Sequence, residues 1–165
     1  MIEQHFLKVS VDDLLMFSGR IEDCLGRLNH DQIWTRHTKN ENAVGNLVLH
    51  LCGNARQWII SGVGGKPDVR DRDSEFAANG GIDPAELAQH LKTTVAEAAD
   101  VIRNLPPERL IETKTIQKYY NGTLMEAIYH VVEHFAQHTG QIIFATKLLT
   151  GQDLGYYKHL NPASA

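Results

Sequence analysis

The chain has 165 residues, of which 42% are hydrophobic and 22% charged. This is ordinary for a globular protein with a real core, and we expect residues 1–165 to form a single domain. The 16 basic and 20 acidic residues give a formal charge of −4, which argues against nucleic acid as a partner because such proteins usually carry a basic face. No run approaches the roughly 18 apolar residues of a membrane helix, and the first residues lack the form of a signal peptide. We therefore expect a cytoplasmic protein with no membrane partner.

The first half of the chain predicts two helices and a long connection. Apolar residues recur every three or four positions from about Glu3 to Leu28, which is typical of a bundle helix. A second apolar stripe runs from about Ala43 to Ile60 and ends at the Gly- and Pro-containing segment 61–67. The polar connection over residues 62–82 is long for a compact bundle, and such loops are often functional.

A third helix is predicted from Asp83, a capping residue followed by proline, to the pair Pro106–Pro107. Residues 108–122 are ambiguous. Part of this segment could be extended, and Asn121–Gly122 is a turn signal. We expect four long helices and no convincing sheet.

The last helix carries the most informative pattern in the chain. Thr123 and Glu126 form a capping box that opens it, and the helix then presents three histidines spaced by four, His130, His134 and His138. At about 100° per residue, His138 lies about 60° from the centre of the apolar stripe, His134 about 100° and His130 about 140°. His134 and His138 should therefore sit at the rim of the buried face, whereas His130 should turn toward solvent or an interface.

A further histidine, His50, lies beside Leu47 at the edge of the second helix's stripe. Two imidazoles one turn apart, as in His134 and His138, can bind one metal ion. A third ligand from another helix would leave a coordination position open, as in catalytic zinc sites. A lone histidine is more often a hydrogen-bonded core or surface group, and the sequence does not show that the two helices meet.

The segment His130-Val-Val-Glu133-His134 also fits the inverted zincin pattern H-x-x-E-H, in which the glutamate acts as general base. Only three of its five positions are fixed, and Glu133 falls nearly opposite the apolar stripe. We therefore disfavour a peptidase.

The two cysteines and the remaining histidines do not indicate a further reactive site. Cys24 and Cys52 do not form a C-x-x-C motif, so we expect buried thiols. Five histidines lie in polar or terminal surroundings and should be solvated: His5, His30, His37, His90 and His159.

Two stretches resemble a known family. They are Asn46-Leu-Val-Leu-His50 and His134-Phe-Ala-Gln-His138-Thr-Gly-Gln-Ile142. Together with the order and length of the four helices, they resemble the DinB/YfiT-like superfamily of metalloenzymes. The resemblance spans nearly the whole chain, and the histidine-glycine-glutamine piece is its most specific part.

The resemblance implies an all-α fold, a four-helix bundle with an up-down-down-up course, and a homodimer. It also implies a divalent metal ion, zinc or nickel, held by His50, His134 and His138, whereas His130 has no clear family role. Some similar proteins are S-transferases that use a low-molecular-weight thiol such as bacillithiol, mycothiol or glutathione. Others are maleylpyruvate isomerases, and many have no assigned activity.

Three hypotheses follow. The first is a metal-dependent enzyme, a transferase, hydrolase or isomerase, acting on a small-molecule substrate. The second is a non-catalytic dimeric metal-binding bundle, with His130 as a possible fourth ligand. The third is that the histidines are ordinary polar groups. Apolar residues outside the main stripe of the last helix, including Tyr129 and Phe144, are compatible with a dimer. Four polar side chains could orient the metal ligands: Asn46, Asn54, Gln137 and Gln141.

Overall fold

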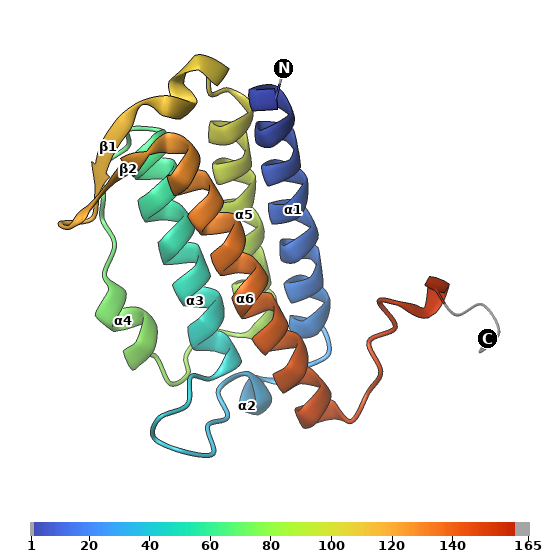
Figure 1. Cartoon of the computed structure of the whole chain (residues 1–165). Helices are drawn as coiled ribbons and strands as arrows, with labels where there is room; N and C mark the ends of the chain where they lie inside the picture. The colour runs from blue at the N-terminus through green and yellow to red at the C-terminus, as the bar shows by residue number, and fades with distance from the viewer. Residues whose placement is uncertain (1, 161–165) are drawn as a thin grey trace.

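The computed structural model describes residues 2–160 and shows a bundle of four long helices (Figure 1). They are α1 (Ile2–Leu25), α3 (Val44–Ala55) with its continuation η1 (Arg56–Val63), α5 (Pro84–Arg103) and α6 (Leu124–Thr150). The predicted all-α fold is confirmed. No described helix has the length and apolar character needed to cross a membrane.

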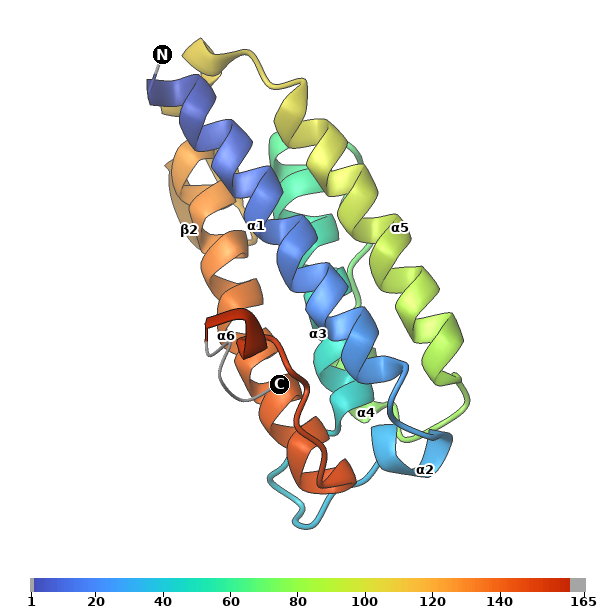
Figure 2. The same ribbon diagram turned by 90° about the vertical axis from the view of Figure 1, so that its right-hand side faces the viewer.

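The helices follow the predicted up-down-down-up course. α1 and α6 run in one direction, and α3 and α5 run in the other (Figures 1 and 2). α1 packs against α5 and α6, and α3 packs against the same two helices. Because α3 and α5 are parallel, the chain must return along the bundle between them, which explains the long connection that contains α4 (Arg72–Ala77).

The predicted helix boundaries at α5 and α6 are confirmed by their caps. Asp83 begins α5 with a capping box and a proline at the first helical position. The Thr123 side chain accepts from the Glu126 backbone N–H, and the Glu126 side chain accepts from the Thr123 N–H at 2.7 Å. Gly151 ends α6 with a φ of 67°, which a glycine adopts without strain.

The core lies between the four helices and is built from the apolar stripes that the sequence shows. Leu14, Leu51, Leu91 and Phe135 are fully buried, one from each long helix. They belong to a cluster of buried apolar residues that extends along the bundle. Cys24 and Cys52 lie in this cluster as free thiols, as predicted, and burial raises the pKa of Cys52 to about 12.

The expectation of no sheet is wrong. β1 (Thr113–Ile116) and β2 (Tyr120–Thr123) form an antiparallel hairpin before α6. Its turn lies at residues 117–119, where Gln117 has a φ of 56°. The Asn121–Gly122 pair therefore lies within β2 and not at a turn. Gly122 serves a close approach there, because a Cβ would come within 2.8 Å of several atoms of the Tyr120 side chain.

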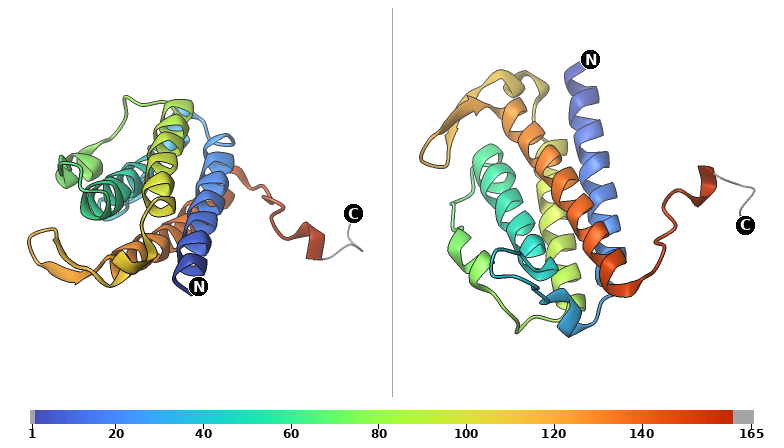
Figure 3. Two further views of the ribbon diagram at one scale, coloured as in Figure 1. Left: turned by 90° about the horizontal axis from the view of Figure 1, so that it is seen from above. Right: turned by 60° about the horizontal axis from the view of Figure 1, so that its bottom comes forward.

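Short helical segments account for the other departures. The first helix ends at Leu25, and Asn29 caps a separate four-residue helix, α2 (His30–Ile33). Asp71 caps α4 inside the segment expected to be a loop. Two 3-10 helices, η2 (Pro107–Ile111) and η3 (Lys158–Leu160), precede the hairpin and follow α6. Figure 3 shows α4 beside α3, on the side of the bundle away from η3.

Candidate metal centre

The structure brings His50 of α3 together with His134 and His138 of α6. The Nε2 atom of His134 lies 3.1 Å from Nε2 of His50 and 2.9 Å from Nε2 of His138. One ligand nitrogen from each imidazole falls within 4.8 Å of the others, a spacing that could hold a metal ion. The antiparallel packing of α3 against α6 produces this convergence.

The three imidazoles occupy the rim positions that helix geometry predicts. His50 is buried, with 7% of its surface exposed, and His134 and His138 are half-buried. Burial, with the neighbouring imidazoles of His138 and His50, lowers the pKa of His134 to about 3. Burial also lowers the pKa of His138. Both rings are therefore neutral at pH 7, the state in which a histidine binds a metal ion.

A carboxylate that the sequence did not single out orients His50. The Nδ1 atom of His50 lies 3.0 Å from Oε2 of Glu75 on α4. Arg70 donates two hydrogen bonds to the same carboxylate, of 2.7 and 2.8 Å. Burial alone would raise the pKa of Glu75, but the hydrogen bonds from Arg70 and His50 hold it below its ordinary value.

This ionised carboxylate selects the tautomer of His50. The guanidinium of Arg70 also comes within 3.1 Å of His50 Nδ1. Guanidinium has only donors, and it already donates to Glu75, so Nδ1–H donating to the carboxylate satisfies the whole group. That tautomer leaves the Nε2 lone pair directed at His134. A ligand histidine that donates its other ring N–H to a carboxylate is the usual arrangement around protein-bound metals.

Gly53 is the sequence signal that points to this carboxylate. It lies within α3, where glycine is destabilising relative to alanine by roughly 1 kcal/mol. A Cβ at this position would collide with the carboxylate of Glu75 and come within 3.0 Å of Nε of Arg70. The glycine therefore makes room for the group that orients His50.

His138 is oriented in the same manner by Gln141, one of the predicted supporting residues. Its Nδ1 lies 2.6 Å from Oε1 of Gln141. An amide oxygen only accepts, so Nδ1–H donates and Nε2 again presents a lone pair to His134. Two lone pairs thus converge on one nitrogen of His134, which as a neutral ring can donate only one proton there. Among residues 2–160 the buried Nδ1 of His134 has no partner. A cation among the three Nε2 atoms would satisfy these three nitrogens and leave the Nδ1 proton on His134, so the residues fit a metal ion.

His130, predicted to turn toward solvent or an interface, packs against another helix of the same chain. Its ring is half-buried, 4.2 Å from the Trp58 ring, and it stacks on His134 at 5.5 Å with an angle of 14°. The cause is η1, a π-helical extension of α3 that carries Trp58 over this turn of α6. His130 Nε2 lies 3.4 Å from the amide nitrogen of Asn54, away from the three-histidine group. Burial lowers the pKa of His130.

The same arrangement contradicts the inverted zincin interpretation. Glu133 is exposed, and His130 Nε2 faces Asn54 rather than the Nε2 atoms of the other imidazoles. Among the described residues, the buried Oδ1 of Asn54 and Nε1 of Trp58 have no hydrogen-bond partner. Unpaired buried polar atoms are rare, and π-helical turns often occur at functional sites.

A comparison with protein-family models matches residues 1–160 to the family described as "Protein of unknown function (DUF1572)". The chain belongs to this family. It resembles a solved structure titled "Crystal structure of the conserved protein of locus from Enterococcus faecalis", with a TM-score of 0.74 and 16% sequence identity over 88% of this chain and 97% of that one. At this identity the likeness shows the fold alone. No curated protein matches the chain.

The remaining predicted residues of this DUF1572 member do not orient the three histidines. Asn46 accepts from the Ala43 N–H at the start of α3 and donates to the Ala78 carbonyl, so it does not orient a ligand. Gln137 is exposed on α6. The five histidines expected in solvent, His5, His30, His37, His90 and His159, are all exposed.

Proposed function

We propose that this protein is a metal-dependent enzyme of the DinB-like superfamily, with His50, His134 and His138 holding one divalent ion, zinc or nickel. The single observation that carries the proposal is the convergence of three Nε2 atoms, two of them on rings oriented from outside by Glu75 and Gln141. Such support of ligand histidines is expected around a metal site.

The ligand number favours an enzyme over a structural site. Structural zinc sites use four protein ligands, whereas catalytic ones use three and keep a position open. When bound, such an ion makes a water molecule or a thiol nucleophilic near neutral pH. We therefore propose transfer of a low-molecular-weight thiol, or a related hydrolysis or isomerisation, acting on a small molecule.

The chain's own residues orient the metal ligands and place unpaired polar atoms beside His130. Arg70 and Glu75 hold the ring of His50 in one tautomer, and Gln141 does the same for His138. Asn54 Oδ1 and Trp58 Nε1 are unpaired beside His130 within the described chain. We propose that the Trp58 Nε1–H donates to, and Asn54 Oδ1 accepts from, polar groups of the substrate, one turn of α6 away from the metal ligands.

Cobalt(II) substitution tests the proposal, because its visible absorption bands report the number and type of ligands. The bands should change when azide or 2-mercaptoethanol is added. They should be lost in His134→Ala and kept in the control His130→Ala. Bands that ignore azide and thiol but change in His130→Ala would indicate a filled four-ligand site and the non-catalytic alternative. No bands in the parent would contradict a metal site altogether.

The homodimer also stays a proposal. Apolar side chains remain exposed on α1 and α6, including Val9, Met16, Tyr129, Phe144 and Leu148, and large exposed apolar surfaces mark interfaces. Light scattering coupled to gel filtration should give twice the chain mass. A single-chain mass at micromolar concentration would contradict this.

A further inference from the structure

A cavity separate from the metal centre lies on the side of α6 that faces α1. It has a volume of about 480 Å³, is partly open to solvent, and is bordered by α1, α6 and the segment after α6. Volumes of this size are typical of sites for small organic ligands. The segment after Gly151 leaves the end of α6 (Figure 2), and its residues Asp153 to Lys158 line one side of the pocket. None of the three metal-centre histidines lines this cavity.

The wall contributed by the C-terminal segment is anchored. The Tyr156 hydroxyl lies 2.9 Å from the Asp23 carboxylate and 3.1 Å from the Arg20 carbonyl oxygen, and these two acceptors share its single proton. Leu154 is buried in the core cluster. These contacts hold the C-terminal segment in place, so the cavity is part of the fold.

Its charge is opposite to that of the whole chain. Three cationic residues, Arg20, Lys147 and Lys158, line the cavity with one carboxylate, Asp153. Asp153 pairs with Lys158 at 4.0 Å. Among residues 2–160 Arg20 has no acidic partner, and its guanidinium lies 5.4 and 5.8 Å from the ring centres of Tyr156 and Tyr157. Stacking of this kind orients the guanidinium while leaving its N–H donors free for an anion.

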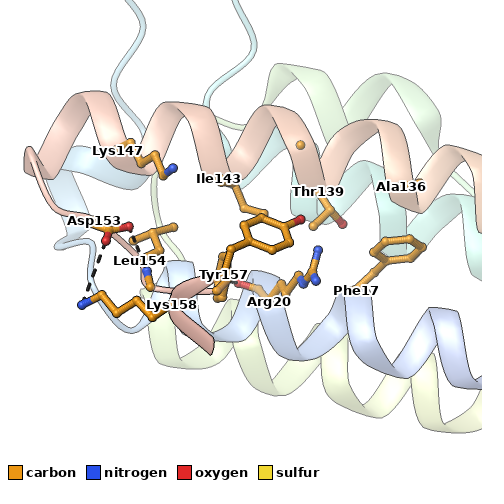
Figure 4. A pocket seen from close by; sticks show the side chains of 13 residues that line it. Phe17, Arg20, Ala136, Thr139, Ile143, Lys147, Asp153, Leu154, Tyr157 and Lys158 are labelled. Atoms are coloured by element: carbon orange, nitrogen blue, oxygen red, sulfur yellow. Dashed lines mark hydrogen bonds and ion pairs between the residues drawn. The ribbon is translucent and has the colours of Figure 1, made fainter. Parts of the chain in front are cut away.

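A buried hydroxyl opposite Arg20 also lacks a partner. Thr139 is 2% exposed, and its Oγ1 makes no hydrogen bond to any described residue. Two other threonines of α6 satisfy their hydroxyls by donating to the carbonyl four residues earlier: Thr146 to Ile142, and Thr150 to Thr146. Figure 4 shows Arg20 extending from α1 and Thr139 from α6 toward the same space.

We propose that this cavity binds a small organic anion, independently of the metal centre. Its phosphate or carboxylate group accepts hydrogen bonds from the Arg20 guanidinium and the Thr139 hydroxyl. Its apolar part packs against Phe17 and Ile143, which line the same cavity. Lys147, on the far side of Ile143 from Arg20 in Figure 4, adds positive potential that draws the anion in.

Titration calorimetry of the full chain with phenyl phosphate tests the proposal, beside inorganic phosphate and the uncharged analogue phenol. Phenyl phosphate should bind more tightly than either. Arg20→Gln should weaken binding by about tenfold or more, since it removes a charge-assisted hydrogen bond. Lys147→Gln should weaken it by about two- to threefold. The matched control is Arg109→Gln, because Arg109 pairs with Glu112 and does not line the cavity.

Thr139→Val separates a ligand role from a structural one. Removing an unpaired buried hydroxyl should keep or raise the melting temperature while weakening phenyl phosphate binding. Unchanged affinity in both Arg20→Gln and Thr139→Val, or no binding by the parent chain, would overturn the proposal. Equal affinity for inorganic and phenyl phosphate would overturn the part that assigns an apolar subsite.

Discussion

Two sides of α6 make an informative comparison. Toward α3, His134 and His138 meet His50, and outward bonds to Glu75 and Gln141 aim the imidazoles inward. Toward α1, Thr139 borders a cavity in which cationic side chains outnumber acidic ones. Successive residues of a helix point about 100° apart, so His138 and Thr139 serve different sides. One helix can thus carry a site whose side chains are held by hydrogen bonds within the chain and a second site whose polar groups have no hydrogen-bond partner in the described chain.

The largest effect should come from the core that both sides share. Phe135 is fully buried on α6, whereas Phe144 on the same helix is 65% exposed. Phe135→Ala should lower the free energy of unfolding by about 3–5 kcal/mol through lost burial and a cavity. In the single chain, where no partner covers it, Phe144→Ala should change it by about 0.5 kcal/mol or less. Urea denaturation measures both, and equal losses would contradict the packing described.

Removing the hydrogen bond from His50 to Glu75 should lower metal affinity without affecting the cavity beside α1. Glu75→Gln keeps the shape but loses the ionised carboxylate, and metal affinity should fall by about 10–100-fold. Competition with a chelating dye gives the affinity. Glu133→Gln is the matched control, since Glu133 is exposed. A loss in the control as large as that in Glu75→Gln would mean that general charge, and not orientation of His50, is responsible.

Acid should lower the free energy of unfolding of the metal-free protein because His134 has a lowered pKa. His134 takes up a proton near pH 6.5 when unfolded, but its folded pKa is about 3. The unfolded state therefore binds more protons between these values, and stability should fall as pH drops from about 6.5 toward 3. The slope is at most about 1.4 kcal/mol per pH unit, reduced by partial exposure. Denaturation of chelator-treated protein at several pH values should show a flatter dependence in His134→Gln. Identical slopes would contradict the assignment.

The smallest effect should distinguish two threonines of α6. Thr139 Oγ1 has no partner in the described chain, whereas the Thr146 hydroxyl donates to the Ile142 carbonyl at 2.8 Å. Thr139→Val should leave stability unchanged or raise it by about 1 kcal/mol, and Thr146→Val should lower it by about 1 kcal/mol. Thermal denaturation without added anions measures both. The same loss in both variants would show that the Thr139 hydroxyl is already satisfied in the folded chain.

The sequence predicted the parts of this molecule that rest on helical periodicity. The stripes, the caps at Asp83 and Thr123, and the rim positions of His134 and His138 all depend on spacing within one helix. The prediction that His50 lies beside His134 and His138 came from the family resemblance. The sequence did not predict the role of Glu75, because this residue lies on a six-residue helix in a polar connection and no local pattern links it to His50. The mid-helix Gly53 was the one available signal.

The contact of His130 with Trp58 was not predicted, for a related reason. An angle on a helical wheel says which way a side chain points, but not what lies there. The π-helical continuation of α3 carries Trp58 over His130, and such a tertiary cover is invisible in the pattern of α6. The hairpin was missed because its strands are only four residues long, too short for a clear alternation of apolar and polar residues.

The most direct test of the central claim is the metal content of untagged protein by mass spectrometry, beside the triple variant His50→Ala, His134→Ala and His138→Ala. The arrangement of the three imidazoles predicts about one equivalent of zinc or nickel per chain in the parent and essentially none in the variant. A parent that holds no metal, even after reconstitution with either ion, would contradict the claim. So would a variant that retains the parent's content.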